Sequence, residues 1–249
     1  MNPDFFLFML IGFVAQVIDG ALGMAYGVTA NSFLLSFGLP PAAASACVHV
    51  AEVFTTGVSG FSHFKLGNVD RYLLARLLIP GVIGGVAGAY LLSEVPGGKI
   101  KPFIAVYLAA MGVLILIKAI RQPVEREVRS TLIPLGLAGG FFDAIGGGGW
   151  GPIVTSTLVA RGNNPRFTIG SVNASEFFVT LAESITFLLT LTLSRQYLWN
   201  IGGLLLGGVL AAPLAALVTK RVSARRLMLG VGILIIILSI RTIYLVLTA

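Results

Sequence analysis

Two glutamates of this chain lie inside apolar stretches, where helix packing alone does not explain an acidic residue. Glu52 and Glu176 each lie well inside such a stretch. A charge at the centre of a bilayer costs at least about 2.5–3.5 kcal/mol on insertion scales, so it is usually retained for a reason. His49 and Asn173 precede the two glutamates by three residues and share a helix face with them. We interpret these pairs as a substrate or proton site, with a polar clamp between helices as the alternative; Glu183 is expected to line the same cavity.

Glycine clusters interrupt the apolar stretches that precede these glutamates. The first cluster contains Gly23 and Gly27, and the second contains Gly147, Gly148 and Gly151. Glycine allows the backbone to turn and to expose N–H groups, and the N-terminus of a half-helix made in this way attracts anions. We predict that these glycines border an anion site, with close helix packing through small residues as the alternative.

Aromatic and acidic residues accompany both glycine clusters. Tyr26 and Trp150 offer a phenol and an indole donor to an oxyanion, and anchoring at the membrane interface is the alternative. Asp19 and Asp143 come shortly before the glycines. An aspartate in that position caps a half-helix or coordinates a coupling cation, and we favour the cap.

The composition shows what kind of structure must position these residues. Of 249 residues, 56% are hydrophobic and only 11% are charged, whereas a soluble domain has about 25% charged residues. A water-soluble globule and a disordered chain are therefore both excluded. We predict an all-α polytopic membrane protein with eight apolar stretches, about four in each half of the chain. The first and fifth stretches, at 5–37 and 132–160, are too long for one simple crossing and are broken by glycine.

Charge and cysteine content exclude several classes of site. The single cysteine, Cys47, rules out an internal disulfide framework and a cysteine-based metal site. The net charge of +7 comes from basic residues in short loops between apolar stretches, which indicates membrane topology rather than nucleic-acid binding. No motif places a serine or cysteine nucleophile beside a base. We therefore expect no enzymatic activity, no cofactor and no bound metal.

The same residue types recur at a constant spacing, which indicates a duplicated chain. Asp143 follows Asp19 by 124 residues, and Glu176 follows Glu52 by the same 124 residues. We predict a first transmembrane repeat at 1–120, a cytoplasmic linker at 121–130 and a second transmembrane repeat at 131–249.

The distribution of basic residues indicates how the repeats are oriented. If every apolar stretch spans the membrane, basic residues divide evenly between the two sides. If the first two stretches of each repeat make a single net crossing, the basic loops at 65–76, 118–129 and 220–226 share one side. The positive-inside rule then favours inverted repeats, a cytoplasmic linker and both termini outside. Which stretch re-enters, and the side of the 161–166 loop, stay open.

These features resemble the sulfite exporter TauE/SafE family. The resemblance covers nearly the whole chain and rests on an Asp-Gly-rich break followed by a Val-(His/Asn)-x-x-Glu-Phe-type segment, matched best at 143–151 and 170–176. It implies a multi-pass protein of the bacterial inner membrane that carries sulfite, sulfoacetate or a related organosulfonate. The chain departs from the pattern in its sparser first-repeat glycines and in His49, which stands opposite Asn173.

Together, the residues and the resemblance lead us to expect a secondary transporter, an exporter or carrier, of a small sulfur-containing anion. It would work by alternating access within the lipid bilayer, with its site between the repeats. Donors near the glycine clusters would hold the anion, helped by His49 and Asn173, while Glu52 and Glu176 would orient these donors or carry a coupled proton. A small-anion channel with the same pore is the alternative.

Overall fold

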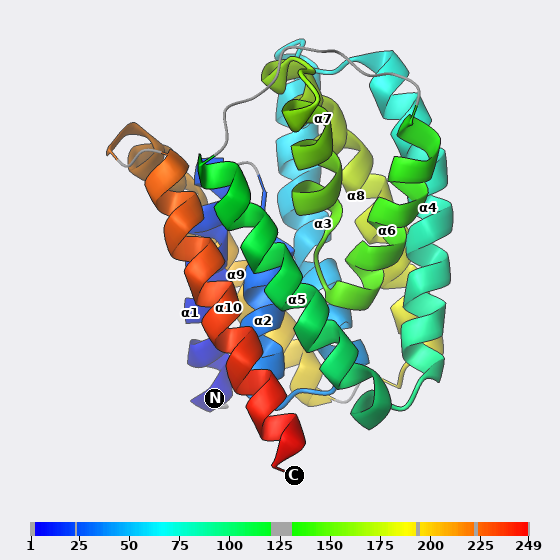
Figure 1. Cartoon of the computed structure of the whole chain (residues 1–249), viewed down its shortest axis with the longest axis vertical. Coiled ribbons are helices and arrows are strands. Elements are labelled where there is room, and N and C mark those ends of the chain that lie inside the picture. The colour runs from blue at the N-terminus through cyan, green and yellow to red at the C-terminus, as the bar shows by residue number, and fades with distance from the viewer. Residues whose placement is uncertain (1–2, 23, 121–130, 193–194, 222–223, 249) are drawn as a thin grey trace.

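The chain forms a bundle of α-helices in a computed structural model that describes residues 3–22, 24–120, 131–192, 195–221 and 224–248 (Figure 1). Within these ranges there is no β-strand, and the predicted all-helical class of a polytopic membrane protein is confirmed. Gly23 and the predicted linker at 121–130 lie outside the described residues.

Both halves of the chain contain the same order of elements: a broken helical pair followed by three long helices. The first half consists of α1 (Pro3–Leu22), α2 (Tyr26–Ser36), α3 (Pro41–Lys65), α4 (Arg71–Glu94) and α5 (Gly97–Ile120). The second half consists of α6 (Leu132–Gly146), a π-helical turn η1 (Gly151–Thr155), α7 (Ser156–Ala160), α8 (Pro165–Thr190), α9 (Arg195–Arg221) and α10 (Ala224–Leu247).

Local sequence signals fix where several long helices begin. α3 and α8 each begin with proline, whose missing N–H and fixed φ suit the first turn of a helix. The Asp70 side chain caps α4 by accepting a hydrogen bond from the Tyr72 N–H at 2.8 Å, and the Asn164 side chain accepts one from the Arg166 N–H at 3.0 Å. These starts set the register of the helices that carry the buried polar residues.

The broken helical pairs enter the bundle from opposite ends (Figure 1). α1 runs inwards to the break at 23–25 and α2 returns, while α6 runs inwards from the other end and η1 with α7 returns. The first apolar stretch of each half therefore folds back on itself within the bundle. These opposite directions are what inverted repeats require, although the origin of the halves by duplication stays a prediction.

The surface of the bundle is apolar and its interior holds charge. Four described helices are long and apolar enough to cross a bilayer: α4, α5, α8 and the Arg225–Leu247 part of α10. Phe103 and Leu189 are 74% and 82% exposed, whereas His49 and Glu183 are fully buried. This distribution is the reverse of that in a soluble protein and suits a lipid environment.

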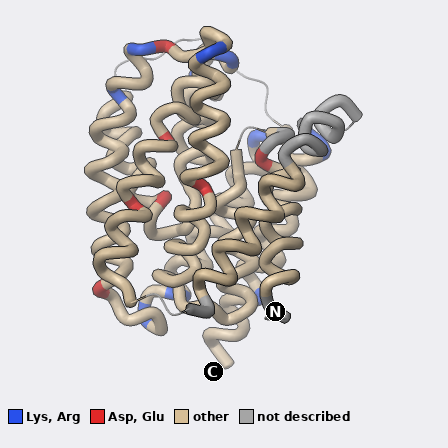
Figure 2. The backbone as a smooth tube through the Cα atoms, turned by 180° about the vertical axis from the view of Figure 1, so that it is seen from behind, with Lys and Arg blue, Asp and Glu red and all other residues tan. Residues whose placement is uncertain are grey.

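Basic residues gather at the ends of the bundle, whereas acidic residues lie both at the ends and at mid-height (Figure 2). The 161–166 loop shares one end with the 65–76 loop, because the Arg166 guanidinium donates hydrogen bonds to the Asn68 side chain at 2.5 Å and to the Leu66 carbonyl at 3.3 Å. We name this end the basic end. The positive-inside rule makes it the expected cytoplasmic end.

Glycines let helices of the two halves approach closely. α1 packs against α9, and α4 packs against α6. A Cβ atom at Gly84 of α4 would overlap the Leu137 carbonyl of α6, and one at Gly207 of α9 would overlap the Met9 carbonyl of α1. Because backbone atoms cannot rotate away, any side chain at these positions forces the helices apart.

Replacing Gly84 with alanine is therefore expected to destabilise the protein by about 1–3 kcal/mol, the usual cost of overpacking. Gly230→Ala in α10 is the matched control, because nothing lies within 4 Å of the added methyl group. Thermal unfolding in detergent micelles measures both variants. A Gly84→Ala protein as stable as wild type would contradict the close approach of α4 and α6.

Candidate functional site

A polar cavity lies between the two halves of the chain. Its volume is about 320 Å³, and its walls come from α1, α2, α3 and α8. It extends from Glu52, in the middle of α3, to His63 in the last turn of that helix, and so towards the basic end. The lining residues are Gln16, Asp19, Leu22, Tyr26, Glu52, Thr55, Thr56, Ser59, His63, Ile169, Asn173 and Glu176.

Acidic side chains dominate the charge of this cavity. Asp19, Glu52 and Glu176 line it, and none of the described lining residues is lysine or arginine. Two buried oxygens have no hydrogen-bond partner in the described part of the chain: the Glu52 carboxylate oxygen Oε2 and the Gln16 amide oxygen. Buried polar atoms are normally hydrogen-bonded, so atoms like these at a cavity wall indicate a bound water, proton or ligand.

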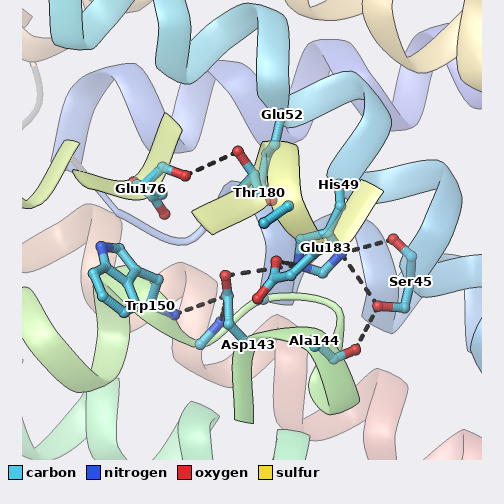
Figure 3. A network of polar contacts seen from close by, with 12 residues as sticks. Ser45, His49, Glu52, Asp143, Ala144, Trp150, Glu176, Thr180 and Glu183 are labelled. Carbon is cyan, nitrogen blue, oxygen red and sulfur yellow. Dashed lines mark hydrogen bonds and ion pairs between the residues drawn. The ribbon is translucent and has the colours of Figure 1, made fainter. Parts of the chain in front are cut away.

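A second polar group lies one helical turn further from the basic end and is sealed from solvent (Figure 3). His49 of α3, Asp143 of α6 and Glu183 of α8 are 0%, 2% and 0% exposed. His49 Nε2 lies 2.8 Å from Glu183 Oε2 and 3.6 Å from Asp143 Oδ2. We name these three residues the buried polar cluster. The Phe187 ring packs beside the imidazole, with 6.0 Å between ring centroids.

Asp143 joins this cluster to the glycine break of the second half. Its Oδ1 atom accepts hydrogen bonds from the Gly149 and Trp150 N–H groups at 2.5 and 2.8 Å. Its other oxygen, Oδ2, faces His49. Asp19 has a matching but weaker role in the first half, because its Oδ1 accepts from the Tyr26 N–H at 3.1 Å. Both aspartates therefore cap the half-helix that follows the break, as their positions in the sequence suggest.

The two glycine breaks meet inside the bundle. A Cβ at Gly27 would lie 2.6 Å from the Gly148 Cα and 2.8 Å from the Gly147 carbonyl oxygen. Gly148 has a φ of +142°, a conformation that favours glycine. The Asn31 side chain donates to the Gly146 carbonyl across this contact. Glycine is required here because two backbones touch, which is the packing alternative considered from the sequence.

Several donors predicted to face an anion are engaged inside the protein. The N–H groups of Gly148, Gly149 and Trp150 all bind oxygens of Asp143. The Trp150 indole donates to the Val172 carbonyl at 3.2 Å. Gly151 packs against Met24. We therefore do not assign direct contacts with an anion to Gly147, Gly148, Trp150 and Gly151.

The remaining predicted residues divide between the cavity and the cluster. Tyr26, Asn173, Glu52, Glu176 and Asp19 line the cavity, whereas His49 and Asp143 belong to the buried polar cluster. Gly27 lies at the contact of the breaks. Trp150 and Tyr26 are 0% and 2% exposed, which excludes the alternative that they anchor at the membrane interface.

Sequence reasoning gave too little weight to some residues. Glu183 does not line the cavity as expected; it is the nearest acidic partner of His49. Gln16 was missed, although it is the lone polar residue in the apolar run from Phe5 to Ile18. Ser59, which occupies the position equivalent to Glu183 in the first half, lines the cavity instead.

A helical membrane bundle with two broken helical pairs around a mid-bundle polar cavity is an architecture found in membrane transporters. Comparison with known proteins agrees with this class. The chain belongs to the family described as Sulfite exporter TauE/SafE, whose pattern it matches over residues 8–242.

Two curated relatives are described as transporters. The chain is 44% identical to the Probable membrane transporter protein YtnM of Bacillus subtilis (strain 168) over 245 residues, which cover 95% of this chain and 81% of the relative. It is 25% identical to the Probable membrane transporter protein ORF9 of Sinorhizobium sp over 219 residues, which cover 85% of this chain and 81% of the relative. No solved structure matches the chain.

Proposed function

We propose that this membrane transporter carries a small sulfur-containing anion, such as sulfite or an organosulfonate, by alternating access. The observation that supports this most is the polar cavity between the halves, which reaches towards one end of the bundle and stops at mid-height. The family description, a sulfite exporter, supports the class of substrate. The cavity of about 320 Å³ suits a small ion or organosulfonate.

Neutral polar groups in the cavity supply donors for such an anion. The amides of Gln16 and Asn173 and the hydroxyl of Ser59 line it. The carboxyl groups of Glu52 and Glu176 repel an anion when they are ionised, but donate hydrogen bonds to it when they are protonated. Binding of the anion therefore favours protonation of these groups, and transport is proton-coupled.

The side of the cavity away from the basic end supports a carrier rather than the alternative of a channel. The buried polar cluster and Phe187 fill this side and are sealed from solvent. A channel needs a continuous path for the ion, whereas a carrier exposes its site to one side at a time. The proposal includes the substrate class, the location in the inner membrane and the cytoplasmic position of the basic end.

Counterflow in proteoliposomes tests the proposal. Vesicles loaded with unlabelled sulfite, sulfoacetate, taurine or sulfate are diluted into a trace of the same labelled compound, with acetate and phosphate as controls. We expect transient accumulation of one sulfur compound above its equilibrium level. Electrical conductance without accumulation would favour a channel. Absence of both, from protein shown to be folded, would overturn this substrate class.

A further inference from the structure

The hydrogen bonds of His49 identify which nitrogen carries a proton. Nδ1 lies 2.8 Å from the Ser45 carbonyl oxygen. A carbonyl only accepts, so Nδ1 must donate its hydrogen. The Ser45 hydroxyl is also within 3.2 Å of Nδ1, but it donates to the Ala144 carbonyl at 2.6 Å and offers only a lone pair to the ring. This arrangement leaves Nε2 unprotonated unless His49 is charged.

Nε2 nevertheless lies against a carboxylate. The Glu183 Oε2 atom is 2.8 Å away, and the other polar neighbour of this carboxyl group is the Asp143 carboxyl, which also offers only lone pairs when ionised. An ionised carboxylate has only lone pairs, and two lone pairs facing each other at this distance in a dry interior repel strongly. One proton must therefore lie between the two atoms, on Nε2 or on Oε2. A metal ion bound by both atoms would lie off the line between them, so metal binding is tested separately below.

Asp143 provides a second acceptor for the same proton. The Asp143 side chain is 2% exposed, and its Oδ2 atom lies 3.6 Å from His49 Nε2. His49 Nε2, Asp143 Oδ2 and Glu183 Oε2 thus converge on one point, and the described residues outside the cluster offer them no hydrogen-bond partner. Because the chain brings them from both halves, a movement of the halves relative to each other changes the distances among them.

The surrounding charges connect this point to the cavity. Glu52 lies three residues after His49 on α3, and Glu176 lies seven residues before Glu183 on α8. Asp19 of α1 lines the same cavity as Glu52. The Tyr107 hydroxyl of α5 lies beside the glycine break, where it donates to the Gly148 carbonyl at 3.5 Å. The buried polar cluster therefore stands between the acidic cavity and the end of the bundle opposite the basic end.

We propose that His49 and Glu183 form a proton relay, through which a proton passes between the cavity and the end of the bundle opposite the basic end. In this relay the Nε2–H bond breaks as the Oε2–H bond forms, and the imidazolium–carboxylate pair becomes a neutral pair. Asp143 accepts the same proton when the halves move. The inference rests on the proposed function, since it assigns the path by which the proton of that carrier leaves.

Glu183→Gln tests this relay, because glutamine keeps the shape of the side chain but cannot accept or release a proton. Exchange of labelled for unlabelled anion requires no net proton release, so counterflow is expected to stay close to wild type. Net uptake driven by a pH gradient requires release and is expected to fall at least about tenfold, because a positioned proton-transfer group typically contributes more than that to a rate. Equal loss of both activities in folded protein would overturn the relay.

A second measurement detects the proton without any transport. The chain has only two histidines, His49 and His63, so ¹⁵N-histidine labelling gives two ring spin systems, and His63→Gln assigns them. We expect His49 Nδ1 to be protonated and Nε2 to share a proton in wild type, and Nε2 to have the shift of an unprotonated nitrogen in Glu183→Gln. Unchanged Nε2 would overturn the inference.

The two measurements separate the possible failures. If wild-type protein transports no sulfur anion but the ¹⁵N shifts behave as expected, the proposed substrate class fails and the shared proton stands. If zinc or manganese binds with a stoichiometry of one and shifts the His49 nitrogens, the cluster is a metal site and the relay is wrong. Glu176→Gln, on the same helix but in the cavity wall, is the matched control and should leave the His49 shifts unchanged.

Discussion

Anion binding to the wild-type protein is expected to weaken as the pH rises, and the Glu52→Gln, Glu176→Gln double variant is expected to lose this dependence. At low pH the two carboxyl groups are neutral and donate hydrogen bonds; at high pH they are ionised and repel the anion. A carboxylate about 6 Å from an anion costs about 3 kcal/mol at an effective dielectric constant near 20, or roughly 100-fold in Kd. Glutamine is neutral at every pH and retains a donor.

Equilibrium binding of a labelled sulfonate, whose own charge is constant over the range, measures this effect between acidic and alkaline pH. Glu94→Gln is the control, because Glu94 is exposed at the end of α4 and lies outside the cavity wall. His63 and Asp19 also line the cavity, so His63→Gln and Asp19→Asn are measured alongside. A double variant that stays as pH-dependent as wild type would show that Glu52 and Glu176 do not face the anion.

Asp143→Ala is expected to cause the largest loss of stability among substitutions at the site, about 4 kcal/mol. The substitution leaves the Gly149 and Trp150 N–H groups without an acceptor inside the bundle. Each buried donor without a partner costs about 1–3 kcal/mol. It also removes the Oδ2 atom that faces His49.

The first half of the chain provides the matched control for this effect. Asp19 makes the equivalent cap with a single hydrogen bond to the Tyr26 N–H, so Asp19→Ala should cost only about 1 kcal/mol, the usual value of a helix cap. Titration with sodium dodecyl sulfate from mixed micelles measures the unfolding free energy of both variants. Similar losses for the two would contradict the different roles of the aspartates. Asp143→Asn, which retains an oxygen acceptor, should be intermediate.

Much of the fold follows from residue types and their spacing. Long apolar stretches predict helices, the glycines at 147–151 predict the break, and the lipid cost of Glu52 and Glu176 predicts that they face a polar interior. The caps made by Asp19 and Asp143 are local, because each spans only the residues of one break. Interactions of this range are readable from sequence.

The parts that sequence did not reveal depend on contacts between the halves. Free N–H donors at Gly149 and Trp150 are evident from a glycine break, but only the structure shows that Asp143 already occupies them. Glu183 and Glu176 lie on one helix and are the same residue type, yet one faces α3 and α6 while the other faces the cavity. That difference is set by which helices pack on α8, and a single sequence carries no record of it.

The contact of Gly27 with Gly148 has a mechanical consequence. Here Gly27 of one half touches Gly148 of the other through backbone atoms, and backbone atoms offer no rotamer that can absorb a displacement. A displacement of one broken helical pair is therefore expected to displace the other. In the proposed alternating access, this contact would tie opening at one end of the bundle to closure at the other and so suppress a leak of ions through a molecule open at both ends.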